Sequence, residues 1–399
     1  MASPHRAATA TAPWARLAAI AALYVSLGAV LGFVQGGIGP ILRGKGHALA
    51  SMAPVFALYL PFGVTFLWAP LVDRWRLPWL GRRSGWIVAA QGLAVLLVAV
   101  IALDGALPLA VLFGLGLATT LAVATMDVAL DAWTVEHIAD VHRGAASAAK
   151  VGGLSLGAVL GGGVLVGLYP RLGWEGVLLL LAALMALATL PAWRLPDHAA
   201  QAARQARPSL RAALRQPAMA GRLLRISLVT CALMALFNLN RLMLVDLGVP
   251  LARIGWVLGV AAPLANLAMA LALPAALRRC APGALLWGLL AATVAGALAI
   301  VIALRGGDAD LAIAASIAIS ACVSGLYIVM GSLILGWAAG GQAATDYALL
   351  YGLGRFVGTL ALLGMPALIA RSGWPAFYAV AALCATLAVA VFMAALRKN

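Results

Sequence analysis

Residues 71–85 read LVDRWRLPWLGRRSG, a short polar segment with four arginines and one aspartate between two long apolar runs. The run before this segment covers Ala50–Leu71, and the run after it covers Gly85–Leu103. A helix that crosses a bilayer needs about 20 mostly apolar residues, so each run is long enough to cross a membrane and the segment between them is a loop. The same alternation continues in both directions along the chain, which predicts an all-α, polytopic membrane protein.

The composition of the whole chain supports the same prediction. Apolar residues make up 64% of the 399 residues, charged residues make up only 10%, and the mean hydropathy is +1.04. A soluble domain carries about 25% charged residues, so this chain has too few of them to cover a surface that faces water. We therefore expect the lipid bilayer to be its solvent.

Runs of sufficient length recur along the chain, and we count about twelve of them. The first follows a polar N-terminal segment and is longer than a signal-peptide core, so we expect an uncleaved first helix. The predicted spans are Leu17–Leu42, Ala50–Leu71, Gly85–Leu103, Leu107–Leu130, Ala145–Leu168, Trp174–Ala192, Ile226–Val245, Ile254–Leu277, Ala284–Leu304, Leu311–Trp337, Ala348–Ile369 and Pro375–Leu396.

The positions of the basic residues predict the orientation. The net charge is +15, but the lysines and arginines form neither a basic face nor an aromatic stacking platform, so we expect no nucleic-acid partner. With the N-terminus inside, the inner segments hold 19 of the 27 basic residues. By the positive-inside rule, both termini lie in the cytoplasm, and we expect a multi-pass protein of the bacterial cytoplasmic (inner) membrane.

Motifs for enzymatic, metal or cofactor chemistry are missing from the sequence. The four cysteines have no metal-ligand spacing, and the chain has no G-x-x-x-x-G-K-[ST] phosphate loop, H-E-x-x-H motif, nucleophile elbow or haem motif. We therefore expect no enzymatic activity, no cofactor and no metal site.

The chain divides into two halves with a polar connector between them. We predict an N-terminal six-helix bundle at residues 1–194, a cytoplasmic connector at 195–222 and a C-terminal six-helix bundle at 223–399. RLGWEGVLLLLAAL from Arg171 and RSGWPAFYAVAAL from Arg371 share an R-x-G-W turn at an offset of 200 residues. This similarity favours an internal duplication over chance likeness between apolar helices. Two six-helix halves related by an axis along the membrane normal are the major facilitator architecture, in which substrate binds between the halves near the bilayer midplane.

The loop at residues 71–85 contains the first candidate gating residues. Asp73 is placed at a helix end and is followed by the basic pair Arg82 and Arg83, as in the signature loop of major facilitators. A carboxylate is not favoured at a helix C-terminus, so a charge latch that holds one conformation is a plausible role. The alternative is a cytoplasmic loop with solvated charges.

Two carboxylates at the end of the fourth span are the candidate proton-coupling groups. Asp127 and Asp131 are four residues apart and share one helix face. Ionisable residues within spans are costly in lipid and usually face a cavity. The alternative is an ion pair with Lys150 or Arg143 that seals the cytoplasmic end.

Two arginines within spans are the candidate contacts for an anionic solute. Arg241 is placed near the far end of the seventh span and Arg355 deeper in the eleventh, and either one could instead extend to the membrane interface. Other polar residues in spans are candidate solute contacts, although each alone could simply bond a neighbouring helix. They are Gln35, Asn238, Asn266 and Tyr327.

Small residues at every fourth position indicate close helix packing. Gly153, Gly157 and Gly161 recur in the fifth span, and Gly354 with Gly358 in the eleventh. This spacing lets two helices approach closely. The same glycines could form the seam that moves during alternating access.

Three stretches resemble AmpG-type muropeptide permeases. Residues 66–91, FLWAPLVDRWRLPWLGRRSGWIVAAQ, have the W-[AS]-P-L-x-D-R start and the G-R-R-x-G-W end of the corresponding loop. Residues 126–163, MDVALDAWTVEHIADVHRGAASAAKVGGLSLGAVLGGG, have DAW, RGA and a glycine-rich helix in the same order. ATDYALLYGLGRFVG from Ala344, with SGWPAFY after it, fits the same pattern. Acetyl-CoA transporters and the RhtX/FptX-type siderophore permeases are related branches.

The chain departs from the AmpG pattern at four positions. Met126 stands where AmpG-type chains tend to have a glutamine, and Asn240 with Arg241 stand where they have an acidic residue. Asp346 replaces a neutral polar residue, and we assign it to the gate. Losing a carboxylate and gaining a cation should change both coupling and substrate charge, which favours the siderophore-permease branch.

The resemblance implies a secondary active, proton-coupled permease that acts as a monomer and imports a moderately large anionic or zwitterionic solute. A ferric siderophore is the first expected substrate and a muropeptide the second. Two further hypotheses remain, a drug efflux pump and a membrane assembly factor that transports nothing. An assembly factor should not need the intramembrane carboxylates Asp127 and Asp131.

Overall fold

The computed structural model describes residues 13–75, 77, 81–103, 107–138, 143–195, 215–216, 218–337 and 343–396. Within these ranges every regular element is a helix. Lipid offers no hydrogen bonds to a backbone, so a spanning segment must satisfy its own N–H and C=O groups, as a helix does.

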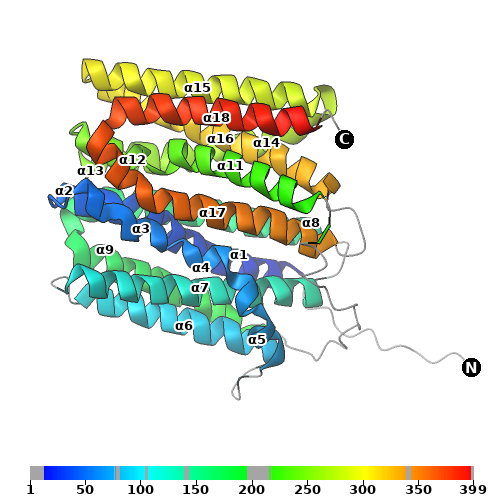
Figure 1. The fold of residues 1–399 in the computed structure, drawn as a ribbon. Helices are drawn as coiled ribbons and strands as arrows, with labels where there is room; N and C mark the ends of the chain where they lie inside the picture. The colour runs from blue at the N-terminus through cyan, green and yellow to red at the C-terminus, as the bar shows by residue number, and fades with distance from the viewer. Residues whose placement is uncertain are drawn as a thin grey trace, which may run out of the picture.

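The first half of the chain forms one bundle of helices (Figure 1). Its longer elements are α1 (Pro13–Phe33), α6 (Arg82–Leu103), α7 (Leu109–His137), α8 (Arg143–Val159) and α9 (Val166–Thr189). Three short elements interrupt or extend them: the π-helix η1 (Val34–Ile38), α2 (Gly39–Gly44) and the π-helix η5 (Leu160–Leu165).

The second half forms the other bundle. Its elements are α11 (Met219–Asn238), α12 (Asn240–Asp246), α13 (Leu251–Arg253), the π-helix η7 (Ile254–Leu258), α14 (Gly259–Arg279), α15 (Pro282–Gly306), α16 (Ala309–Trp337), α17 (Ala343–Ser372) and α18 (Trp374–Leu396). The seventh predicted span is divided, because the helix stops at Asn238 and starts again at Asn240.

The second predicted span, Ala50–Leu71, is not one continuous helix. It consists of η2 (Leu49–Met52), α3 (Ala53–Ala57), α4 (Leu60–Gly63), η3 (Thr65–Leu67) and α5 (Ala69–Arg74). The helices α3, α4 and α5 each have a proline in their first two positions. Proline is tolerated there but cannot continue a preceding helix, so three prolines within one span divide it into short pieces.

Ten segments of the described residues are long and apolar enough to cross a membrane. One of these segments, Ala149–Trp193, has 45 residues, about twice the 20 that one crossing needs. It turns at Gly173, where φ is +68° in the middle of α9, and therefore makes two crossings. With the divided second span added, the described residues contain twelve such crossings, in agreement with the predicted count of about twelve.

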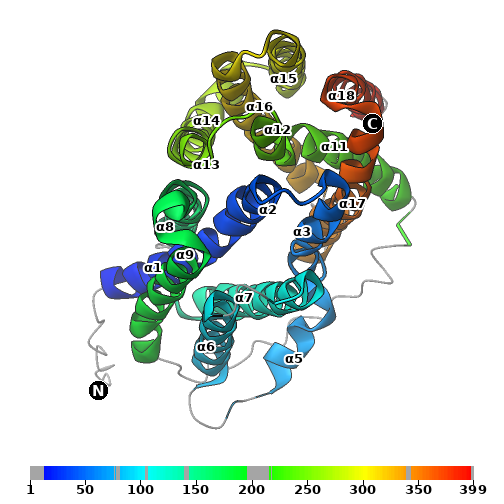
Figure 2. The ribbon, with the colours of Figure 1, turned by 90° about the vertical axis from the view of Figure 1, so that its left-hand side faces the viewer.

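The hydrophobic side chains form two cores, one in each half. One core runs from Leu17 to Leu195, and the other is built mainly from α11 to α18. Five residues of the first half, one at the end of the first span and four near the start of the second, join the second core: Leu42, Leu49, Met52, Val55 and Phe56. Figure 2 shows α2 and α3 reaching toward α12 and α17 of the other half. The halves therefore meet along α2 and α3, at the end of the molecule that carries Arg43.

The two R-x-G-W turns have matching geometry. Gly173 and Gly373 both have positive φ, +68° and +76°, and each lies at the bend between two crossings. The indole of Trp174 donates to the carbonyl of Ile101 at 3.1 Å, and that of Trp374 donates to a carboxylate oxygen of Asp246 at 2.9 Å. The same turn thus positions an indole donor in both halves.

The glycines at fourfold spacing in α8 face α1 within the same half. A Cβ on Gly157 would lie under 3.0 Å from the backbones of Gly28 and Ala29. Other glycines make the close contact between halves: a Cβ on Gly259 would meet the backbones of Gly162 and Gly163 just as closely. The spacing of Gly153, Gly157 and Gly161 therefore packs α8 against α1, as expected of close helix packing, and the halves also meet where α14 contacts η5.

The predicted connector at 195–222 lies largely outside the described residues. The boundaries 1–194, 195–222 and 223–399 therefore remain predictions. We name the two ends of the bundle from described residues: the Arg43 end carries α2 and α13, and the terminal end is where α1 begins and α18 ends (Figure 1).

Candidate functional site

A polar cavity of about 220 Å³ lies between the two halves. Four of the six residues predicted to contact solute line it together: Gln35, Asn238, Arg241 and Asn266. The remaining lining residues are one further amide, Asn240, and small, apolar or hydroxyl-bearing residues: Gly32, Leu154, Ser155, Ala158, Phe237, Leu258, Ala262, Pro263, Ser316 and Ser320. Of the described residues that line the cavity, Arg241 is the one with a charge, so the cavity favours an anion.

The break in the seventh span brings the polar groups to this cavity. Asn238 ends α11 and donates to the carbonyl of Met234 at 3.1 Å, while its own side-chain oxygen accepts from Gln35 at 3.2 Å. Gln35 belongs to the first half and Asn238 to the second, 203 residues later. This hydrogen bond therefore joins the halves at the cavity wall.

Arg241 extends from α12 into the first half. Its Nη1 donates to the carbonyl oxygen of Gly36 at 3.1 Å and also to that of Gly162. Both glycines lie in π-helical segments, η1 and η5. The sequence predicted a cationic contact for solute here, but it gave no sign that two carbonyls of the other half would hold the guanidinium.

Two more polar pairs support the second-half wall of the cavity. Ser320 donates to the side-chain oxygen of Asn266 at 3.0 Å, and Tyr378 donates to that of Asn240 at 2.6 Å. Tyr378 and Asn240 are both buried. Asn240, one of the positions at which the chain departs from the expected AmpG pattern, thus accepts a buried hydrogen bond.

Arg355 and Tyr327 are not among the residues that line this cavity. Arg355 is exposed on α17. Tyr327 lies on α16 with a buried hydroxyl. Their roles as solute contacts remain predictions.

The two candidate coupling carboxylates form a charged cluster inside the first half. Lys150 of α8 lies 2.7 Å from both carboxylate oxygens of Asp131 and 3.7 Å from one oxygen of Asp127. Tyr24 of α1 donates to Asp131, and its ring lies 4.8 Å below the Lys150 ammonium. Lys150 is one helical turn before Leu154 and Ser155, which line the central cavity. The sequence gave no signal for Tyr24, because its partners come from helices far apart in the chain.

The candidate gate is described only in part. Arg83 is buried at the start of α6, and its Nη1 points to the carbonyl of Val72 on α5 at 3.5 Å, while Arg82 lies on the same first turn. The side chains of Asp73 and Asp346 lie outside the described residues. The latch between these groups therefore stays a prediction.

An ion pair that the sequence did not predict joins the halves at the Arg43 end. Arg43 Nε lies 2.6 Å from one oxygen of Asp246, and the Trp374 indole donates to the other oxygen at 2.9 Å. A second N–H of Arg43 donates to the carbonyl of His47 at 2.9 Å. Arg43 and Asp246 are 203 residues apart, the same offset as Gln35 and Asn238. Both pairs therefore join the first half to the second.

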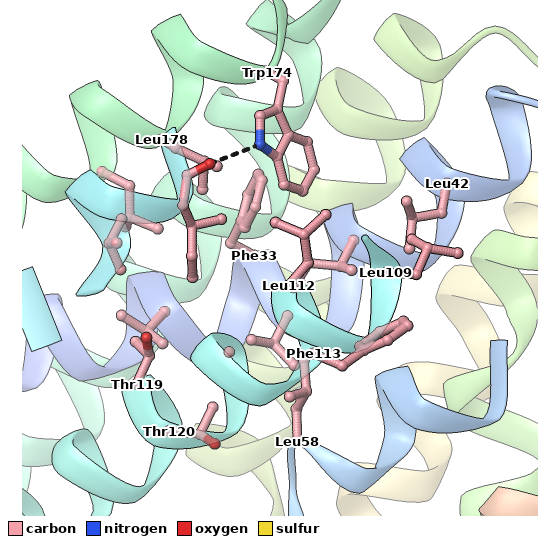
Figure 3. A pocket seen from close by; sticks show the side chains of 17 residues that line it. Phe33, Leu42, Leu58, Leu109, Leu112, Phe113, Thr119, Thr120, Trp174 and Leu178 are labelled. Atoms are coloured by element: carbon pink, nitrogen blue, oxygen red, sulfur yellow. Dashed lines mark hydrogen bonds between the residues drawn. The ribbon is translucent and has the colours of Figure 1, made fainter. Parts of the chain in front are cut away.

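A second cavity, of about 60 Å³, lies inside the first half and is lined almost entirely by apolar side chains. Figure 3 shows Phe33, Leu112 and Trp174 gathered around it. Its two hydroxyl groups, on Thr119 and Thr120, donate to carbonyls of their own helix. Since it offers no free polar group for a polar solute, we assign the chemistry to the cavity between the halves.

No group of three or more histidine, cysteine, aspartate or glutamate side chains lies close enough to hold a metal ion in the part of the chain that the structure describes. The expectation that the protein has no cofactor remains a prediction.

Known proteins provide three comparisons. The chain is 36% identical over 122 residues to the anhydromuropeptide permease of Escherichia coli (strain K12), a segment that covers 30% of this chain and 25% of that permease. The chain therefore matches about a quarter of the length of this relative.

Solved structures of transporters match over nearly the full length. A mutant form of the nucleoside transporter NupG has a TM-score of 0.74 at 13% identity and covers 95% of this chain and 98% of its own. A bacterial homologue of the lysosomal transporter Spinster, in an inward-facing and unoccupied conformation, has a TM-score of 0.66 at 16% identity and covers 97% and 98%. At these identities the likeness concerns the fold alone.

The family model described as Major Facilitator Superfamily matches residues 17–279, about two thirds of the chain. Three properties of this chain agree with that match: its two helical halves, the polar cavity between them and its similarity to an anhydromuropeptide permease. This chain therefore belongs to the major facilitator superfamily, and its sequence relatives support a place in the AmpG-like branch.

Proposed function

We propose that this membrane permease is a secondary active importer for an anionic solute of the muropeptide class, driven by protons and without enzymatic activity. One observation carries the proposal: among the described residues that line the polar cavity between the halves, Arg241 is the one cation, it lies among amide and hydroxyl groups, and none of these residues is acidic. A guanidinium binds a carboxylate through two parallel hydrogen bonds, which gives both affinity and orientation.

The relative at 36% identity supports the choice of substrate class. Its name assigns anhydromuropeptides to that protein, and the matched segment is about a quarter of it. The sequence patterns alone favour a ferric siderophore over a muropeptide, and this relative favours the reverse order. The cavity of about 220 Å³ is below the roughly 300–1,000 Å³ of drug-sized sites, so it fits the carboxylate-bearing part of such a solute.

The coupling proposal rests on the cluster around Lys150. A proton bound by Asp131 or Asp127 would weaken its ion pair with Lys150, one helical turn from the cavity. In this proposal, the terminal end faces the cytoplasm of a bacterial inner membrane, and the Arg43 end, closed here by Arg43 and Asp246, faces outward. The basic residues between the spans support this orientation.

Uptake of radiolabelled anhydromuropeptide tests the proposal. We expect cells that lack their own permease to accumulate the label when they express this chain, and a protonophore to abolish the accumulation. Arg241→Gln should raise the KM at least about tenfold, because an uncharged amide cannot replace a bidentate guanidinium. Uptake of ferric siderophore in the same cells, without uptake of anhydromuropeptide, would show that the muropeptide proposal is wrong.

A further inference from the structure

Arg241 is bound at one edge by the opposite half of the protein. The residue belongs to α12 of the second half, and both carbonyls that accept from its Nη1, those of Gly36 and Gly162, belong to the first half. A guanidinium carries five N–H donors, of which Nη1 supplies two. The Nη1 bonds therefore leave Nε and Nη2, an edge whose two parallel N–H groups match a carboxylate.

The two acceptors come from the irregular parts of otherwise regular helices. Gly36 lies in the π-helix η1 and Gly162 in the π-helix η5. An α-helix uses each internal carbonyl for the N–H four residues on, whereas a π segment widens this pattern and lets carbonyls turn to an outside donor. The π segments thus supply polar acceptors at a place where the lipid-embedded bundle otherwise offers few.

Only glycine leaves room for the guanidinium at position 36. A Cβ built there would lie under 3.0 Å from Nη1 and from Cζ of Arg241, and all three of its nearest neighbours are guanidinium atoms. At Gly162, a Cβ would meet the carbonyl oxygen of Gly32 at 2.8 Å and Nη2 of Arg241 at 3.3 Å. A side chain at either position must therefore displace the arginine or the backbone that holds it.

We propose that Gly36 and Gly162 are positioning residues for solute binding: their carbonyl oxygens fix Nη1 of Arg241 so that its Nε and Nη2 edge can bind the carboxylate of the solute. This inference rests on the proposed function of the cavity. Because the acceptors and the arginine belong to different halves, the anion site is complete only while the halves meet at this seam. Binding of the anion and closure of the Arg43 end therefore favour each other.

Uptake kinetics in Gly36→Ala and Gly162→Ala provide the first test. We expect each variant to raise the KM for radiolabelled anhydromuropeptide about tenfold and to leave Vmax within about twofold of the unmodified protein. The KM for the same compound with its carboxylates converted to carboxamides should also stay within about twofold, because that compound offers no anion to the guanidinium. Gly92→Ala and Gly152→Ala are matched controls, since a Cβ at either helical position meets nothing within 4 Å. Both glycine variants could keep the preference for the carboxylate compound over the carboxamide compound while Arg241→Gln loses it. That result would overturn the inference and leave the proposed function intact.

A second measurement needs no solute. Phenylglyoxal modifies free guanidinium groups, and mass spectrometry of the peptide that contains Arg241 gives the rate of its modification. We expect faster modification in both glycine variants than in the two controls, and equal rates would overturn the inference even if the protein does not transport anhydromuropeptide.

The double variant Gly36→Ala with Arg241→Gln covers the case in which Gly36→Ala does not fold. Since the crowding atoms all belong to Arg241, the second substitution should restore the amount of protein in the membrane. A double variant that is as poorly expressed as Gly36→Ala alone would assign Gly36 to general packing and overturn the inference.

Discussion

At the scale of single residues, Lys150 is the shared partner of two carboxylates. It lies 2.7 Å from Asp131 and 3.7 Å from Asp127, and the side chain of Asp131 is half exposed. An exposed ion pair contributes only about 0–1 kcal/mol to stability, so this cluster adds little to the stability of the fold. We therefore assign it a role in proton coupling.

Asp131→Asn tests that role. The variant imitates a permanently protonated carboxyl group, so we expect proton-driven accumulation of solute to fall at least about tenfold while exchange of solute across the membrane continues. Uptake with a pH gradient, compared with counterflow without one, measures both quantities. Asp310→Asn is the control, because Asp310 is a highly exposed partner of Arg253 outside the cluster. Full accumulation by both Asp131→Asn and Asp127→Asn would contradict the coupling proposal.

A second prediction at this scale concerns the buried pair of Tyr378 and Asn240. Tyr378→Phe leaves the Asn240 side-chain oxygen without its 2.6 Å donor in a buried place. We expect a loss of about 1–3 kcal/mol in the free energy of unfolding, the cost of an unsatisfied buried acceptor. Thermal unfolding in detergent measures it, with Tyr169→Phe on the half-buried surface of α9 as the control. An equal Tm for both variants would show that the pair contributes nothing.

At the scale of elements, glycine determines where a hairpin of two crossings can turn. Gly173 and Gly373 have φ of +68° and +76°, and a Cβ on Gly173 would meet nothing within 4 Å. An alanine there would therefore fit in space but not in backbone conformation.

Gly173→Ala should accordingly destabilise the protein by about 1–2 kcal/mol, the cost of a left-handed conformation for a residue with a Cβ. Gly364→Ala on α17 is the matched control, since it also meets nothing within 4 Å but is helical, where alanine is favoured over glycine by about 1 kcal/mol. Thermal unfolding of the two variants should shift Tm in opposite directions, and shifts in the same direction would contradict the explanation.

At the scale of the whole molecule, Arg43 and Asp246 hold the two halves together at one end. Their side chains are 29% and 18% exposed, so the pair is neither fully solvated nor fully buried. A contribution of about 1 kcal/mol to the closed state corresponds to a population ratio of roughly fivefold.

Asp246→Asn should therefore open the Arg43 end several-fold more often. A cysteine at Ser316, which lines the cavity, reports this opening through its rate of labelling by an impermeant maleimide from outside, in a chain whose four native cysteines have been replaced. In the double variant Arg43→Asp with Asp246→Arg, which exchanges the two charges, the cysteine at position 316 should be labelled nearly as slowly as in the chain with the unmodified pair. Fast labelling of the exchanged pair would show that the ion pair is not what closes this end.

The amount that could be predicted differs between fold and site. The number of crossings, their helical nature and the polar residues Gln35, Asn238, Arg241 and Asn266 follow from apolar run length and from the cost of polar groups in lipid. Gly36 could not be singled out, because a glycine that leaves room for a guanidinium looks like any other glycine in a span. Tyr24 and Asp246 were missed for a related reason: their partners are 107 and 203 residues away in the chain.

By itself, the sequence determined that this protein is a membrane protein of about twelve helical crossings, with few polar groups available for a site. Each of these properties depends on local composition, because lipid selects apolar helices segment by segment. Only the tertiary structure decided which polar groups meet. Three sets of contacts join one half to the other: the hydrogen bond between Gln35 and Asn238, the ion pair of Arg43 with Asp246, and the hydrogen bonds from Arg241 to the carbonyls of Gly36 and Gly162. Such contacts depend on how two bundles face each other, which no single apolar run encodes.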